Sequence, residues 1–468
     1  MTRLRIALLS AAAAAVAVAA PATAQTSMNM PGMKMPAPKK EAAAKKPPAK
    51  KGSTKKASTK KARMKKGAAK KSAPKKTTNA SPDHDMSTMP GMNMPPTPPA
   101  GGQAMSSMPG MDMPAGAESN EGAMVRFNQF MLYSHTSGPR GQSRLTGPGN
   151  WMLMYDKDLS SGNHLSVDMM GTPEQLTVGN KGTPQLLQTE NIDAMHPHDY
   201  IMALEFRDSL TLNTHDKEQL TFLFAPRGEA AIGPVPFMHR QSAEGNPDAP
   251  LGHALQDGFH DVSTVLGIEY QFARTTIEAT AFSGKNIVWP LPLHNPDSYS
   301  VRVNQNIDDR LSLGASYADA LLPNDTGAEH DKFISAWLTG SYLIANNTLK
   351  FSLVWGQGRA AHGAPLNSFL EEAVYQQGRN KFYDRAEILQ ITPDQLELVV
   401  PGGGAGPKWA KALTIGYERT VFEKNDLSLF VGGSYTQDFT PGEFQPAYGS
   451  DPMGGKVYLR MAFHGRIH

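Results

Sequence analysis

In the C-terminal two thirds of the chain, apolar residues recur at every second position. Between residues 262 and 272 the even-numbered positions are Val, Thr, Leu, Ile, Tyr and Phe, while the odd-numbered positions are mostly polar. The same alternation runs through 311–317, 413–417 and 427–435. A period of two predicts β-strands that have one apolar face.

Sixteen strands of this kind are predicted, with fourteen as the alternative because strand counts from one sequence err by a hairpin. They span 124–134, 149–157, 162–171, 199–212, 217–226, 259–272, 274–285, 297–306, 309–318, 331–343, 347–356, 367–376, 380–391, 408–421, 426–437 and 454–463. Connections after even-numbered strands have one to four residues, whereas those after odd-numbered strands have about 10 to 32. This alternation is typical of bacterial outer-membrane barrels, with tight turns in the periplasm and long loops outside.

We therefore expect an all-β fold, a transmembrane antiparallel β-barrel over residues 124–468. A closed sheet leaves no unpaired strand edge, which lipid would not tolerate. Four tyrosines on the apolar faces would form part of an interfacial girdle: Tyr270, Tyr317, Tyr417 and Tyr435. Soluble sandwiches also alternate, so a soluble periplasmic β-protein remains the alternative.

The last predicted strand, 454–463, carries Val457, Leu459, Met461 and Phe463 on one face. It resembles the C-terminal signal that the barrel-assembly machinery reads, which usually ends on an aromatic residue. Here five residues follow Phe463, which leaves the register of that signal open. The resemblance implies two partners, the barrel-assembly machinery and outer-membrane lipid.

The N-terminal 24 residues predict export. Arg3 and Arg5 precede an apolar run over 6–20, and Ala22-Thr23-Ala24 matches a signal-peptide cleavage pattern. The chain has no cysteine, so it has neither a disulfide framework nor a thiolate metal site. Its net charge of +3 is uneven, with +12 in residues 25–123 and −11 in 124–468.

Residues 25–123 are expected to be a disordered tail, because they contain almost no Leu, Ile, Val or aromatic residue. Three boxes with the core Met-Pro-Gly-Met-x-Met-Pro stand out in it. Their methionines are Met28, Met30, Met33 and Met35, then Met89, Met92 and Met94, and finally Met108, Met111 and Met113. The Pro-Gly pair favours a tight turn that would fold two sulfurs toward one ion.

A thioether is a soft, uncharged ligand that suits Cu(I) and needs no deprotonation. The boxes therefore predict Cu(I) binding in the tail, and His84 between two aspartates would add a Cu(II) ligand. The alternative is that these methionines contact apolar partners. The boxes resemble the methionine-rich segments of copper-resistance B outer-membrane proteins, which implies copper as cofactor and periplasmic copper proteins as partners.

Lysine doublets recur every five residues from Lys45-Lys46 to Lys75-Lys76. With Ala, Pro, Ser and Thr between them they indicate a solvated spacer. The alternative is adhesion to anionic lipid head groups. Nucleic acid is not expected as a partner, because no aromatic residues interleave the lysines as stacking platforms.

Two long loops concentrate histidines. The second outer loop ends on Met195-His-Pro-His-Asp199, and the third, about 227–258, contains Phe237-Met-His-Arg240 and His253. These segments resemble an uncharacterised group of exported bacterial barrel proteins from copper and heavy-metal resistance loci, which implies a barrel and a metal context. If the third loop folds inward, His196, His198, His239 and His253 would lie near a constriction and bind Cu(II) or another divalent ion. The alternative is that these histidines hold the loops in place by hydrogen bonds and salt bridges and bind no metal.

Enzymatic activity is not predicted. Ser242 lies three residues from His239, but neither a Gly-x-Ser-x-Gly elbow nor a zincin helix is present. The sequence therefore predicts an outer-membrane barrel that binds, resists or transports copper. The alternative is a general porin or substrate channel with an incidental tail.

Overall fold

The computed structural model describes residues 121–468 apart from 161, 191, 196, 216, 285–292, 325–326, 362, 401–405 and 468. The expected signal peptide and nearly all of the expected tail, with every methionine of the boxes and His84, lie outside the described residues. So does His196.

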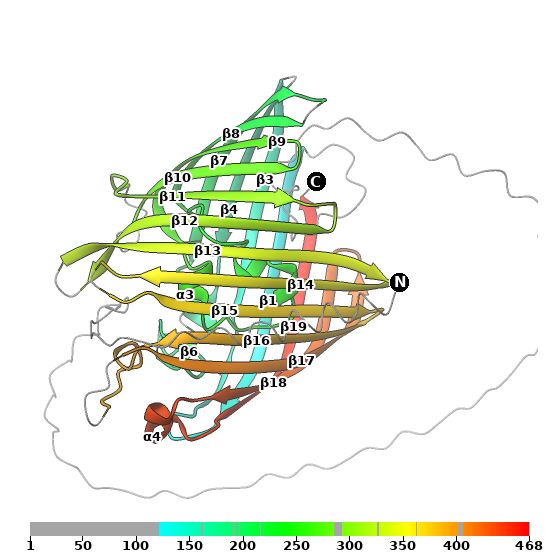
Figure 1. The fold of residues 1–468 in the computed structure, drawn as a ribbon. Coiled ribbons are helices and arrows are strands. Elements are labelled where there is room, and N and C mark those ends of the chain that lie inside the picture. Colours follow the sequence, from blue (N-terminus) through cyan, green and yellow to red (C-terminus); the bar gives the residue numbers. More distant parts are fainter. Residues whose placement is uncertain are drawn as a thin grey trace, which may run out of the picture. The chain divides into compact units, whose positions relative to one another are not determined.

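Long antiparallel strands build almost the whole described structure (Figure 1). They are β1 (Gly122–Thr136), β2 (Ser143–Thr146), β3 (Gly149–Ser160), β4 (Asn163–Gly171), β7 (Ile201–Asn213), β8 (Glu218–Gly228), β9 (Val262–Phe272), β10 (Thr275–Ser283), β11 (Ser298–Asn306), β12 (Leu311–Asn324), β13 (Gly327–Ile344), β14 (Asn347–Arg359), β15 (Leu366–Gln377), β16 (Asn380–Ile391), β17 (Lys408–Lys424), β18 (Leu427–Phe439) and β19 (Met453–Ile467). Short elements occupy the loops: β5 (Thr183–Pro184), β6 (Ala194–Met195), α2 (Glu174–Thr177), η1 (Phe237–His239), η2 (Gln241–Ala243), α3 (His253–Gln256), η3 (Asp394–Leu396), η4 (Gly442–Phe444) and α4 (Gln445–Tyr448).

The main sheet closes on itself. Each long strand pairs antiparallel with the next, and β1 pairs with β19 from Ala123↔Ile467 to Thr136↔Gly454. In Figure 1 the cyan β1 accordingly runs beside the red β19. Of the 17 strands in the sheet, β2 and β3 both pair with β1 and form one interrupted strand, which gives the sixteen strand positions expected.

Most predicted strand boundaries agree with the structure to within a few residues, and two differences are instructive. The last strand was expected to end at Phe463, which is wrong, because β19 continues to Ile467 against the first residues of β1. The hairpin of β12 and β13 is also longer than predicted, since its pairing runs out to Asn324↔Gly327. In both places a partner strand supplies hydrogen bonds that the local sequence pattern does not reveal.

The two faces of the sheet are inverted relative to a soluble protein. Along β9, Leu266 and Ile268 are each 46% exposed on the outer face. The next residue, Glu269, points the other way and is buried in the lumen. The inner faces of β15, β16 and β19 bury Glu372, Arg385 and Arg460. Apolar residues outside and charged residues inside are the arrangement of a transmembrane barrel of the outer-membrane type.

The expected tyrosines follow this pattern. Tyr417 and Tyr435 are exposed on the outer face, and Tyr270 and Tyr317 are half-buried. Among the residues that the structure describes, no helix is both long and apolar enough to cross a membrane.

An arginine on the outer face should destabilise the barrel according to its depth. Ile415 lies midway along β17 and is 56% exposed, whereas Val421 lies near the turn end and is 51% exposed. We expect Ile415→Arg to lower the free energy of unfolding by about 2–4 kcal/mol and Val421→Arg by about 0–1 kcal/mol. Guanidinium unfolding of the protein in lipid vesicles measures both; equal losses would contradict the inside-out assignment.

Candidate functional site

The loop between β8 and β9, residues 229–261, folds into the lumen of the barrel; it is called L3 below. Prolines precede two of its short helices. The His239 N–H donates to the Pro236 carbonyl at 2.9 Å at the start of η1, and the His253 N–H donates to the Pro250 carbonyl at 3.1 Å just before α3. Gly233 has a φ of 75°, and a Cβ there would lie 2.1 Å from the Gln256 carbonyl oxygen. Only glycine therefore permits L3 to fold back on itself at this point.

Arg240 is the central anchor of L3. Its guanidinium donates to Asp257 of the same loop at 2.8 Å and to Glu372 of β15. Ser242 adds a hydrogen bond to Glu372 at 2.8 Å, and Arg385 of β16 pairs with Glu372 at 3.1 Å. Because these charges are almost fully buried, each depends on its partners to offset the cost of leaving water.

Further bonds attach L3 to strands on both sides of Glu372. Gly233 donates to Ser316 of β12 at 2.8 Å, and α3 contacts β13, β14 and β15. Toward the other side, Arg385 donates to the Asp248 carbonyl at 2.8 Å, and Lys456 of β19 pairs with the Asp248 carboxylate. L3 leaves from β8 and returns to β9, so these contacts carry it across the lumen. The inward course of the third loop, on which the expected histidine site depended, is therefore present.

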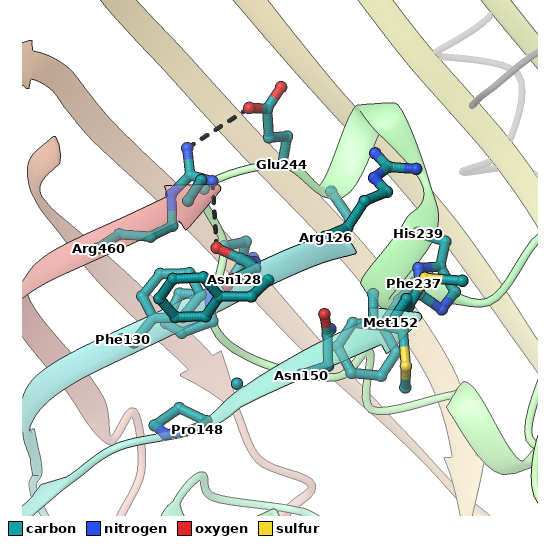
Figure 2. Close-up of a pocket in the computed structure, with 18 of the residues that line it drawn as sticks. Arg126, Asn128, Phe130, Pro148, Asn150, Met152, Phe237, His239, Glu244 and Arg460 are labelled. Atoms are coloured by element: carbon teal, nitrogen blue, oxygen red, sulfur yellow. Dashed lines mark hydrogen bonds and ion pairs between the residues drawn. The ribbon is translucent and has the colours of Figure 1, made fainter. Parts of the chain in front are cut away.

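A cavity of about 350 Å³ remains beside L3. The start of β1, the end of β19 and the β17–β18 turn line it, so it lies at the end of the barrel that carries the short turns and both strand termini. Figure 2 shows Arg460 of β19 at its edge, 3.4 Å from Glu244 of L3 and 3.3 Å from Asn128 of the neighbouring β1. Lys381 and Arg460 hold the pKa of the Glu244 carboxyl at about 2 despite its burial, which by itself raises that pKa.

One wall of this region consists of methionines. Met152, Met154 and Met170 point inward from β3 and β4, and Met202 follows them at the start of β7. Met124 of β1 and Met238 of L3 pack against the same cluster. We call these six residues and His239 the methionine–histidine cluster; Figure 2 shows His239 and Met152 among the residues around the cavity.

His239 faces this cluster from L3. Its Nε2 atom lies 3.0 Å from the Met170 sulfur. Burial, reinforced by the positive charge of Arg126, lowers the pKa of His239 to about 4. The imidazole is therefore neutral at pH 7, which is the form that binds metal ions.

A second group of histidines connects L3 with the second outer loop. His198 Nδ1 lies 3.0 Å from Glu174, and its Nε2 lies 3.4 Å from the Nε2 of His260. The rings of His260 and His253 stand 4.9 Å apart, and His253 Nδ1 lies 2.6 Å from Asp257. Burial and the two neighbouring imidazoles hold the pKa of His260 well below its usual range. These contacts connect His198 of the second outer loop, through His260 and His253, with Asp257, the partner of Arg240.

The loop histidines predicted as metal ligands are thus divided. His198 and His253 meet through His260, whereas His239 faces the methionines. In the described part of the chain, no group of three or more His, Asp or Glu residues is arranged to hold a metal ion. Metal binding by these histidines stays a prediction, as does that of the tail methionines outside the described residues.

His260 and the methionines of the cluster were not predicted as site residues from the sequence. A usable indication was present, because the segment Met152-Leu153-Met154-Tyr155 is apolar on both faces of a predicted strand. An apolar inner face means that something packs against it inside the barrel. The pairing of Ser242 with His239 that was weighed for an enzyme is replaced by bonds from Ser242 to Glu372 and Ser352.

Removing the guanidinium of Arg240 should release L3. Arg240, Asp257 and Glu372 are 3%, 0% and 1% exposed, so Arg240→Met leaves two buried carboxylates with one partner fewer and should cost about 3–5 kcal/mol. The matched control is Arg274→Met, whose ion pair with Asp309 is exposed and contributes less than about 1 kcal/mol.

Guanidinium unfolding and chymotrypsin cleavage after Phe237 report the two effects. We expect a lower midpoint and cleavage only in Arg240→Met. Identical behaviour of the two variants would contradict the anchoring role of Arg240.

Comparisons with known proteins concern the fold. No protein-family model and no curated protein matches the chain. Among solved structures, the chain is similar to OmpF of Salmonella typhi in complex with daunomycin, with 7% identity over 73% of this chain and 97% of that chain and a TM-score of 0.49. It is also similar to the anion-selective porin from Comamonas acidovorans, with 11% identity over 73% and 100% and a TM-score of 0.47. The chain is likewise similar to the outer-membrane channel DcaP of Acinetobacter baumannii, with 11% identity over 75% of this chain and 100% of that chain and a TM-score of 0.44.

Proposed function

We propose that this protein is a porin-like channel of the outer membrane in which L3 forms the constriction. The observation that carries the proposal is the course of L3, which crosses a lumen lined by charged residues and is fixed there by buried ion pairs. A loop fixed in this way narrows the pathway permanently. Small polar solutes or ions, rather than large molecules, are the substrates that such a lumen admits.

The charges of the lumen support a polar pathway. Arg126, Arg240 and Arg460 line the cavity together with Glu174 and Glu244. Both signs are present in comparable number, so the cavity does not repel either ion class as a whole. Pore diameter and the side chains at the narrowest point then decide which solutes pass.

A single introduced thiol tests the channel. Because the chain has no cysteine, Gln241→Cys at the cavity provides the sole site for a methanethiosulfonate reagent. We expect the reagent to reduce single-channel conductance in a planar bilayer to about half or less, since it fills the constriction. Asp309→Cys, at a side chain 93% exposed in a turn, is the control that reacts without changing conductance. A non-conducting unmodified protein, or conductance unaffected by labelling at 241, would refute the proposal.

Copper handling is the second candidate function, and the three methionine boxes of the sequence favour it. In this proposal the boxes capture Cu(I) in the periplasm, and His84, His196, His198, His239 or His253 offer sites for Cu(II). The tail joins β1 at the end of the barrel with the short turns, the end that faces the periplasm in outer-membrane barrels.

The test uses the full-length protein and a variant in which the ten box methionines are leucine. We expect the native chain to take up about three more equivalents of Cu(I) than the variant in a chelator competition, one for each box. Equal, weak uptake by both chains would exclude the boxes as copper sites. Conductance is measured separately, so the channel and the copper proposal can fail independently.

A further inference from the structure

The methionine–histidine cluster differs in composition from the other apolar clusters of the barrel. The cluster under β8–β10 and the cluster near α4 consist of Leu, Ile, Val, Phe, Tyr and Ala, with no methionine. The buried members beside L3 are Met152, Met154, Met170, Met202 and a single alanine, Ala203. Packing alone does not call for this choice, because leucine and methionine have nearly the same volume and leucine occurs in both of those clusters.

The register brings the sulfur-bearing side chains together. Met124 of β1 pairs with Met154 of β3, and Met152 of β3 pairs with Met170 of β4. Directly paired residues on one face of a sheet have Cβ atoms about 4.5–5.5 Å apart. Four thioethers therefore cover one continuous patch of the inner wall, and L3 places His239 on it.

We propose that this cluster binds a soft monovalent cation, Cu(I) or Ag(I), with His239 Nε2 and the Met170 sulfur as the first two ligands. The two atoms are 3.0 Å apart. Two such ligands on one tetrahedral ion would stand about 3.5 Å apart, given metal distances of roughly 2.0 Å to nitrogen and 2.3 Å to sulfur. A rotation within the flexible methionine side chain supplies this difference. Met152, which pairs in register with Met170, and Met238, the residue before His239, are candidates for a third ligand.

Charges of both signs border the patch. Arg126 of β1 pairs in register with Met152. Asp168 lies two residues from Met170 on the inner face of β4 and pairs in register with Met154. Its Oδ2 atom is buried and has no hydrogen-bond partner among the described residues. The thioethers discriminate against hard cations, so a soft ion is the one that this patch would select.

The ion would reach the site from the end of the barrel with the short turns. Met152, Met202, Met238 and His239 all line the cavity there. This site is separate from the boxes of the tail, and it requires neither copper capture by the boxes nor conductance through the channel.

The test is Ag(I) titration of the full-length protein, labelled with ¹³C at the methionine methyl groups, by NMR in detergent micelles and chloride-free buffer. Each methyl signal is assigned through the matching Met→Leu variant, so the lumenal signals are separated from those of the tail. We expect Ag(I), added until the tail signals saturate, to shift the Met170 and Met152 signals, and Mg²⁺ to leave them unchanged. A Met170 signal that stays in place while tail signals shift to saturation would overturn the proposal.

Variants give a second, independent measurement. Met170→Leu and His239→Gln should each weaken Ag(I) binding at the lumenal site at least tenfold, since even changes behind the ligands of a metal cost about tenfold. Met169→Leu is the matched control, because Met169 is the neighbouring residue on the opposite face of β4 and should leave the affinity unchanged. Equal affinities of Met170→Leu and Met169→Leu for the ion reported by the Met152 signal would also overturn the proposal.

Folding of each variant is verified by heat-modifiable migration on gels, a property of intact barrels. Leucine replaces methionine with little loss of stability, so Met170→Leu should fold. If His239→Gln fails to fold, Met170→Leu and the signal shifts of the native chain still decide the question. The titration needs no ion flow, so a channel that fails to conduct would not affect its outcome.

Discussion

Backbone hydrogen bonding within lipid is the constraint from which the other features follow. A membrane offers no water to unpaired N–H and C=O groups, so the sheet must close, and here β1 closes it against β19. Closure gives every strand one face toward lipid and one toward the lumen. Apolar residues such as Leu266 and Ile415 then belong outside, and charged residues such as Glu372 and Arg460 inside. The lumen becomes the place where polar side chains, and any chemistry they perform, must reside.

A polar lumen in turn provides the partners that hold L3. Arg240, Glu244 and Asp248 of the loop pair with Glu372, Lys381 and Lys456 of the strands, while Asp257 pairs with Arg240 within the loop. Such buried pairs add little net stability compared with apolar packing, but each member is costly to leave alone. The network therefore fixes one position of the loop more than it adds to the overall stability. That fixed position sets the course of the loop through the lumen, the cavity beside it and the placement of His239.

The potential metal ligands of this protein fall into chemically distinct groups. His198, His253 and His260 contact Glu174, Asp257 and one another, which suits a structural link between two outer loops. The methionine–histidine cluster offers thioethers and a neutral imidazole, which suit a soft ion. The boxes of the tail repeat the thioether chemistry in the sequence. The three groups are independent, because their ligands differ and a substitution in one group leaves the ligands of the other two unchanged.

The sequence by itself determined the barrel: period-two alternation predicts the strands, and the rhythm of short and long connections supports their number. These are properties of neighbouring residues and are therefore legible along the chain. Only the tertiary structure decided which histidines meet, because His198, His239, His253 and His260 are sorted by the path of L3 and not by sequence distance. It alone also showed the clustering of Met124, Met154, Met152 and Met170, which depends on strand register. A register is set by hydrogen-bonded partners far away in the sequence, so the local pattern that predicts a strand leaves open what its inner face will touch.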